Sequence, residues 1–105
     1  MLVLNGYNVK ISRGDSYAIT VAIDGFVEPG SIARAAIAKR AGAEPIWQKT
    51  VTIADNMAIF ELTAAETGLA ADKYVWDVRV IFPDGSVKTV FTPATFQIVE
   101  VVGRG

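Results

Sequence analysis

The chain has 105 residues, 51% of them hydrophobic, and a formal net charge of −1 at pH 7. This length suits one domain over residues 1–105 with one core, and the apolar content argues against intrinsic disorder. The absence of cysteine excludes disulfides and thiolate chemistry, and the near-neutral charge argues against nucleic acid as a partner.

Two features of the sequence argue against a membrane partner. No apolar run approaches the roughly 18 to 20 residues of a membrane-spanning helix. The apolar start, residues 1–6, lacks the basic residues and the length of a signal peptide. We therefore expect a protein made in the cytoplasm, with an apolar core and some apolar surface that a partner covers.

Alternation of apolar and polar residues predicts two strands near the start of the chain. Apolar side chains recur at every second position in residues 7–12 and again in residues 16–23. Arg13-Gly14-Asp15 lies between the two strands. This tripeptide is used in cell adhesion, but its position favours a plain turn.

Residues 31–40 are ambiguous between helix and strand. Their alanine-rich composition favours a helix. Arg34, however, stands where a capping box needs Glu or Gln, and Ile32 and Ile37 are five positions apart. We predict a strand, because strands flank this segment on both sides.

The middle of the chain predicts two further strands and one helical turn. Residues 47–53 and 57–62 have the composition and alternation of strands. Thr63 and Glu66 match a capping box, and Gly68 follows almost at once. We therefore expect a single helical turn near residues 63–68.

Residues 72–92 predict a β-hairpin around which the fold is organised. Its first arm is apolar at every even position, and Asp84-Gly85 is a strong turn signal. A three-residue loop that includes Pro83 would set Val80 against Lys88. Because register follows the buried face, we predict a two-residue loop instead. That register pairs Phe82 with Val87, Val80 with Thr89 and Val78 with Phe91.

Together these segments predict an all-β fold, an immunoglobulin-like antiparallel β-sandwich of seven or eight strands. Pro93 is expected to interrupt the sheet before a last strand that begins at Phe96. Trp76 lies on the apolar phase of its strand and is predicted to be a core residue. Trp47 shares its phase with Lys49 and is predicted to be the most exposed aromatic side chain.

Residues that could perform catalysis are few. Without histidine or cysteine, a hydroxyl nucleophile has no imidazole base and zinc loses its commonest ligands. Glu61 and Asp77 are the candidate catalytic carboxylates. The presence of Asp77, however, is better explained by its neighbour Arg79, two residues along the same strand face. We expect no enzyme, cofactor or metal site. Four acids lie singly in turns, where the side chain of Asp caps its own turn: Asp15, Asp24, Asp55 and Asp84.

Several motifs follow one another in a characteristic order. They are residues 11–21, the small-residue strand 33–37, residues 60–69, Tyr-Val-Trp-Asp-Val at 74–78, Pro-Asp-Gly-Ser-Val at 83–87 and a terminal strand that ends near Arg104. In this order they resemble a family of small immunoglobulin-like domains in tailed bacteriophages, including the N-terminal domain of baseplate upper proteins. Family members often end in Val-Thr-Arg, where this chain has Val102-Gly103-Arg104.

The resemblance implies a non-enzymatic structural protein of the virion, present in multiple copies on the tail, baseplate or fibre. Its partners would be other virion proteins, including copies of itself. A capsid decoration (cement) protein is an alternative of the same class. A receptor- or glycan-binding adhesion module is an alternative of another class, which an exposed aromatic cluster would favour.

Two segments are apolar in both strand phases, Ile32–Ala38 and Val99–Val102, and a sandwich of this size cannot bury both completely. We expect the terminal strand to be the interface, because an edge strand offers unpaired backbone groups to a partner. The candidate interface residues are Trp47, Val99, Val101, Val102 and Arg104.

Overall fold

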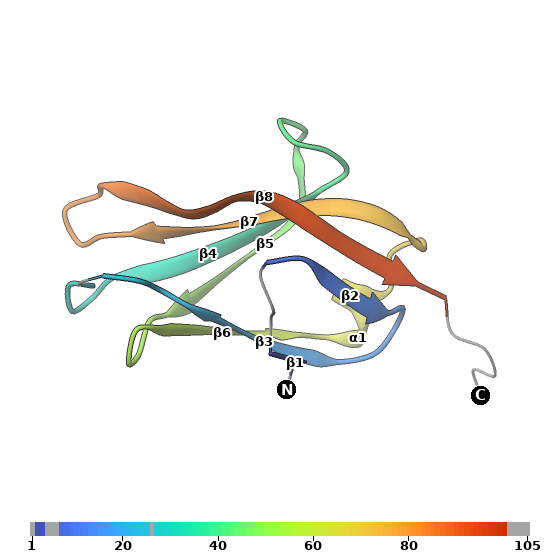
Figure 1. The fold of residues 1–105 in the computed structure, drawn as a ribbon, viewed down its shortest axis with the longest axis horizontal. Coiled ribbons are helices and arrows are strands. Elements are labelled where there is room, and N and C mark those ends of the chain that lie inside the picture. Colours follow the sequence, from blue (N-terminus) through green and yellow to red (C-terminus); the bar gives the residue numbers. More distant parts are fainter. Residues whose placement is uncertain (1, 4–6, 26, 101–105) are drawn as a thin grey trace.

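Two β-sheets face each other across one apolar core in the computed structural model, which describes residues 2–3, 7–25 and 27–100 (Figure 1). The smaller sheet has the order β1 (Leu2–Val3), β3 (Tyr17–Ala22) and β6 (Met57–Leu62). The larger sheet has the order β2 (Val9–Ser12), β8 (Val87–Val99), β7 (Asp72–Ile81), β4 (Ile32–Ala38) and β5 (Pro45–Thr52). The predicted all-β, immunoglobulin-like sandwich is confirmed.

The two least certain segments fold as predicted. Residues 32–38 form β4, a central strand between β7 and β5. Ala64–Thr67 form α1, a single turn in which Thr63 and Glu66 make both hydrogen bonds of the capping box. With four residues, α1 is far too short to cross a membrane, and no other described helix could do so.

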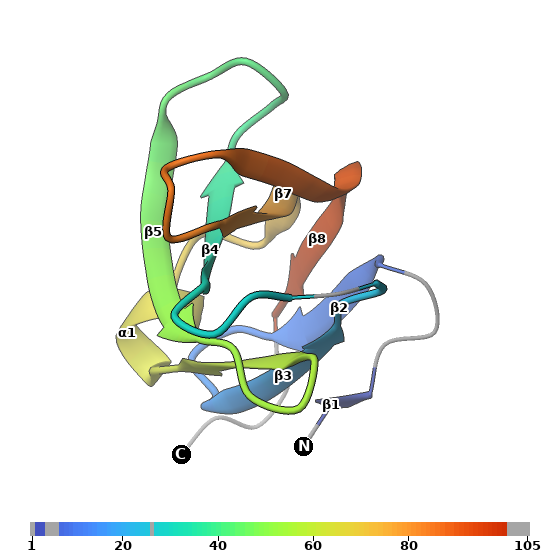
Figure 2. The same cartoon turned by 90° about the vertical axis from the view of Figure 1, so that its left-hand side faces the viewer.

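The sheets are antiparallel except at the N-terminal strands. β1 runs parallel to β3, and β2 runs parallel to β8. From β1 in the small sheet, the chain therefore crosses to the large sheet at β2 and returns to the small sheet at β3 (Figure 2). By this crossing, β2 covers the last four residues of β8.

The predicted register of the hairpin is wrong near its turn. Val80 pairs with Lys88, because the loop holds three residues. The amide of Gly85 donates to Phe82 O, and the amide of Phe82 donates to Ser86 O, each at 2.9 Å. Gly85 has φ +89°, so its left-handed conformation completes a bulged turn. The buried face does not determine the register next to the turn, because bulges farther along β8 shift the pairing of the two strands back.

Two irregularities in the β7–β8 ladder shift the pairing back. One falls between Val78 and Arg79, so that Val78 still pairs with Phe91 as predicted. The other falls between Trp76 and Val78, opposite Pro93. A bulge tolerates a residue without an N–H group. β8 therefore runs unbroken over residues 87–99, and the predicted interruption at Pro93 is wrong.

The core contains Trp76, as predicted, with 2% of its surface exposed. Its indole Nε1 donates a hydrogen bond of 2.7 Å to Tyr7 O, and its ring packs edge-on against Phe91 and Phe96. Tyr74, at the start of β7, donates a hydrogen bond of 2.7 Å from its hydroxyl to Ala70 O. A tyrosine bonded to backbone just upstream at this corner is a hallmark of immunoglobulin-like sandwiches.

Candidate protein-interaction face

The two candidate catalytic carboxylates lie on opposite sides of the molecule. Glu61 projects from the exposed face of β6, in the small sheet, and Asp77 from the outer face of β7, in the large sheet. The core separates them, so they cannot act on one substrate together. No group of three or more acidic residues in the described ranges is arranged to hold a metal ion.

The Arg13-Gly14-Asp15 tripeptide forms the predicted turn and is held by its neighbours. Arg13 pairs with Glu100 at 3.1 Å and also donates to Gly68 O. The buried hydroxyl of Thr67 donates to Asp15 O at 2.6 Å. These contacts give the tripeptide a structural role at the corner between β2 and β3.

Trp47 is half-buried, so its prediction as an exposed contact residue is wrong. Its ring packs edge-on against Phe96, with 6.2 Å between centroids, and its Nε1 donates to Glu66 O at 3.3 Å. The phase that Trp47 shares with Lys49 faces inward, because α1 lies against that side of β5. Trp47 therefore anchors the helical turn.

The last strand is not an edge strand where it was predicted to bind. Residues 96–99 pair with β7 or β2, and the amide of Arg13 donates to Val99 O at 2.8 Å. Val99 itself pairs with Ser12 of β2 and is half-buried. The predicted edge at residues 96–99 is therefore wrong, and Val99 stays a predicted contact only through its side chain. The other predicted contacts, Val101, Val102 and Arg104, lie outside the described residues.

The true edges carry features that oppose strand addition. Lys49 points inward from edge strand β5 and donates to the backbone oxygen of Glu61 on edge strand β6. Its ammonium also pairs with the half-buried carboxylate of Glu66. On the first half of β8, Pro93 lacks an N–H group, and Asn8 Oδ1 accepts from the amide of Thr95 at 3.0 Å. Inward charges and prolines are common devices that protect sheet edges, so the faces are better candidates for binding.

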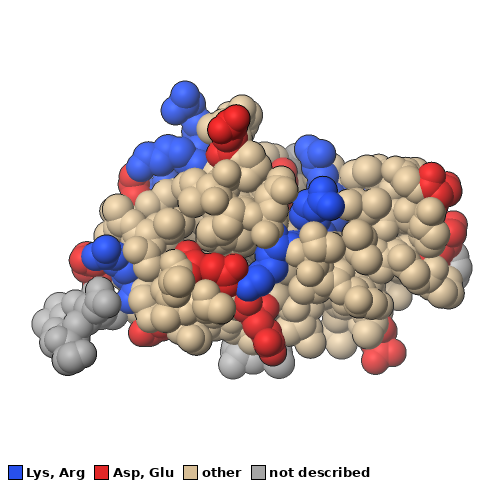
Figure 3. All heavy atoms as spheres, turned by 180° about the vertical axis from the view of Figure 1, so that it is seen from behind, with Lys and Arg blue, Asp and Glu red and all other residues tan. Residues whose placement is uncertain are grey.

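The outer face of the small sheet carries a modest apolar surface. Met57 and Ile59 are 41% and 44% exposed on β6, opposite Ala22 and Thr20 of β3. Figure 3 shows the molecule from behind, where most of the visible surface is uncharged and acidic and basic groups are interspersed. Neither the exposed side chains of the small sheet nor the mixed charges in this view favour one chemical class of partner.

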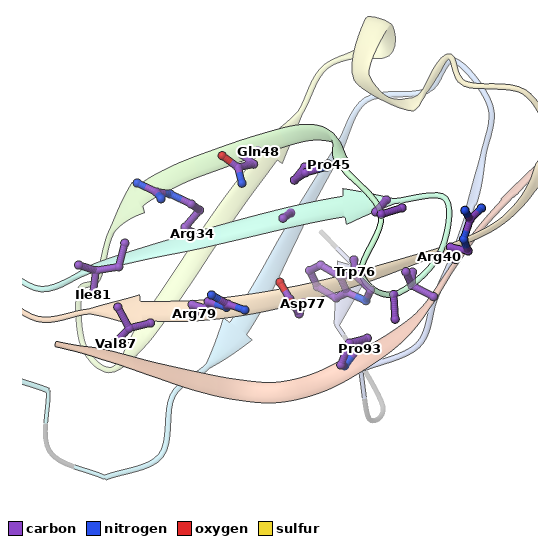
Figure 4. Close-up of a pocket in the computed structure, with 16 residues that line it drawn as sticks. Arg34, Arg40, Pro45, Gln48, Trp76, Asp77, Arg79, Ile81, Val87 and Pro93 are labelled. Atoms are coloured by element: carbon purple, nitrogen blue, oxygen red, sulfur yellow. The ribbon is translucent and has the colours of Figure 1, made fainter. Parts of the chain in front are cut away.

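The outer face of the large sheet is hollowed (Figure 4). Its volume is about 390 Å³, and the loop of residues 39–44 closes one end. Half-buried Ala36 and Ala38 of β4 form its floor. The polar side chains around this floor are Arg34, Arg40, Gln48, Asp77 and Arg79.

Two of these arginines are held close together. Arg34 of β4 pairs directly with Arg79 of β7, so their side chains leave the same face of neighbouring strands. Like charges in directly opposite positions repel. Arg34 also donates to the hydroxyl of Thr50 at 3.3 Å. Asp77 shares this face, yet neither arginine is within 4.0 Å of a carboxylate in the described part of the chain.

The surplus of apolar residues in β4 was predicted from the sequence, but the two arginines that meet on the same face of the sheet were not. The signal was present: Arg34 interrupts the otherwise apolar outer phase of β4, and Arg79 lies on the mixed outer phase of β7. Only the pairing of β4 with β7 shows that the two arginines coincide. We call the surface formed by the alanine floor and these arginines the arginine hollow.

Comparison with known proteins adds no relative to this picture. No family model matches the sequence, and no curated protein matches it.

Proposed function

We propose that the chain is a non-enzymatic structural protein of a tailed-bacteriophage virion, present in multiple copies on the tail, baseplate or fibre. The order of motifs along the chain supports the phage assignment. The observation that carries the structural role is the arginine hollow, a broad sheet face with small floor residues and with cations at its rim that form no ion pair with the described acidic residues. A capsid decoration role would use the same surface.

The shape and the charge of the arginine hollow both suit a protein partner. Alanine side chains let a partner approach the sheet closely, and arginine is enriched in protein interfaces. The principal extents of the molecule are 47 × 28 × 22 Å, so its broad face accommodates the ~800 Å² that a standard interface buries on each partner. A glycan-binding role has less support, because Trp47 packs inward against Phe96.

Incorporation into particles tests this function. Purified particles of the encoding phage should contain the chain in multiple copies after density-gradient separation. Ala36→Phe, which fills the floor of the arginine hollow, should reduce incorporation. Ala22→Phe, the matched control on the outer face of the small sheet, should not. Particles without the chain would refute the virion assignment, and full incorporation of a folded Ala36→Phe protein would refute the use of this face.

A further inference from the structure

The three connections at one end of the sandwich carry acidic residues and no Lys or Arg in their described positions. They join β3 to β4, β5 to β6 and β7 to β8, and they lie together at the left in Figure 1 and toward the viewer in Figure 2. We call this surface the acidic end. Its acidic residues are Asp24, Glu28, Asp55 and Asp84.

Among the described residues, no ion pair neutralises the charges of the acidic end. The ion pairs of the described residues join Arg13 to Glu100, Lys39 to Asp72 and Lys49 to Glu66. None of these pairs includes an acid of the acidic end. Seen from behind, the end at the right in Figure 3 shows acidic atoms and no basic ones.

The arginine hollow has the opposite charge, and its arginines make no ion pair with a carboxylate in the described ranges. Three arginines and one aspartate line it, and two of the arginines face each other across the β4–β7 ladder. That repulsion is relieved when a carboxylate lies between or above the two guanidinium groups. Each guanidinium presents donors in a planar fork that suits a carboxylate.

We propose that the arginine hollow binds the acidic end of a second copy of this chain. The proposal rests on the proposed function and specifies how copies meet in the assembly. The proposed contact is head-to-tail: the hollow of one copy receives the acidic end of the next. Repetition of such a contact produces a ring when the rotation closes and a filament when it does not.

Charge exchange between the two surfaces tests this interface with the isolated full-length chain. One variant, Arg34→Glu with Arg79→Glu, reverses the charge at these two positions of the hollow. The other, Asp24→Lys with Glu28→Lys, reverses exposed positions of the acidic end for which the structure gives no side-chain hydrogen bond. Lys10→Glu with Lys88→Glu is the control for the hollow variant: it makes the same change in net charge as Arg34→Glu with Arg79→Glu, at exposed lysines outside the hollow.

Analytical ultracentrifugation at low salt gives the association constant. The unmodified chain should self-associate, and association should weaken as salt shortens the Debye length to ~10 Å at 0.1 M. Each reversed variant alone should associate at least about tenfold more weakly, which corresponds to about 1.4 kcal/mol. An equimolar mixture of the two should recover association. The lysine control should behave like the unmodified chain, and circular dichroism should show that every variant is folded.

Three results would overturn the proposal: a chain that stays monomeric at low salt, a hollow variant that associates normally, or a mixture that fails to recover. Particle incorporation separates these failures from failure of the proposed function. If a monomeric chain still enters particles and loses entry with Arg34→Glu and Arg79→Glu, the hollow binds an acidic segment of another virion protein. If the chain never enters particles, the virion assignment fails whatever the result in solution.

Discussion

The hydroxyl of Tyr74 lies 2.7 Å from the carbonyl oxygen of Ala70 and donates a hydrogen bond to it. This bond ties the segment after α1 to the start of β7, at the corner where the chain passes from the small sheet to the large one. Tyr74→Phe keeps the buried ring and removes only the bond. We expect the free energy of unfolding to fall by about 0.5 to 1.5 kcal/mol in urea denaturation.

Tyr7→Phe is the matched control for that experiment. Tyr7 is 37% exposed and stacks on Phe91 with 4.1 Å between ring centroids, so loss of its hydroxyl leaves the stacking intact. The free energy of unfolding of the Tyr7→Phe variant should equal that of the unmodified chain within the error of the measurement. Equal effects of the two substitutions would contradict a special role for the Tyr74 bond.

Trp76 should be the most costly single truncation in the large sheet. Trp76→Ala removes a fully buried ring and leaves a cavity beside Phe91 and Phe96, which typically costs about 3 to 5 kcal/mol. A domain of this size has a total stability of about 5 to 15 kcal/mol, so the variant should melt far below the unmodified chain. A shift of a degree or two in the melting midpoint would show that Trp76 is not a core residue.

Glu66 should make the stability of the domain depend on pH. Partial burial by itself would raise the pKa of Glu66, but the hydrogen bond from Lys49, the Thr63 amide and the charge of Lys49 together hold that pKa below its ordinary value of 4.5. Because the folded-state pKa is lower than the unfolded one, the stabilisation is complete above about pH 4.5 and is lost as the pH falls through the folded-state pKa.

Glu66→Gln should therefore lower stability at neutral pH and flatten its decline in acid, as followed by thermal melts from pH 7 to pH 2. Asp72 gives a useful comparison. Its hydrogen bond with Lys39 lowers its pKa, but the pair is exposed, so Asp72→Asn should change stability little. A larger effect at Asp72 than at Glu66 would show that burial of the Lys49–Glu66 pair does not matter.

The turn between β7 and β8 should depend on Asp84. One of its carboxylate oxygens accepts from the amide of Ser86 at 2.9 Å and from the Ser86 hydroxyl at 2.6 Å. These bonds also lower the pKa of Asp84. Asp84→Ala should lower the melting midpoint of the domain measurably. Asp24→Ala, at an exposed loop position without such a bond, should have no measurable effect in the same melts.

The predicted capping of turns by aspartate thus holds at Asp84. For the described Asp15, Asp24 and Asp55, the side chains make no equivalent hydrogen bond in the structure. In one of these turns Asn56 has the capping role: its amide donates to Ile23 O and Gly25 O and ties the β5–β6 turn to the β3–β4 connection. Sequence alone does not show which polar side chain in a turn finds a partner.

Local patterns in the sequence determined most of the secondary structure. Alternation placed β6 at residues 57–62, the spacing of Thr63 and Glu66 placed α1, and the apolar phase of β7 placed Trp76 in the core. These features depend on neighbours along the chain, where steric preference, side-chain phase and short hydrogen bonds act within a few residues. The flanking strands also resolved residues 32–38, whose own propensity favoured a helix.

Only the tertiary structure decided the surfaces. Trp47 turned inward because α1 packs on β5, and residues 96–99 lost their edge because β2 crosses to cover them. Bulges in β8 set a register that a uniform ladder could not predict. Arg34 meets Arg79 only because β4 lies beside β7, although 44 residues separate the two in the sequence. Each of these outcomes depends on contacts between distant segments, and alternation along one strand contains no information about which strand will lie beside it.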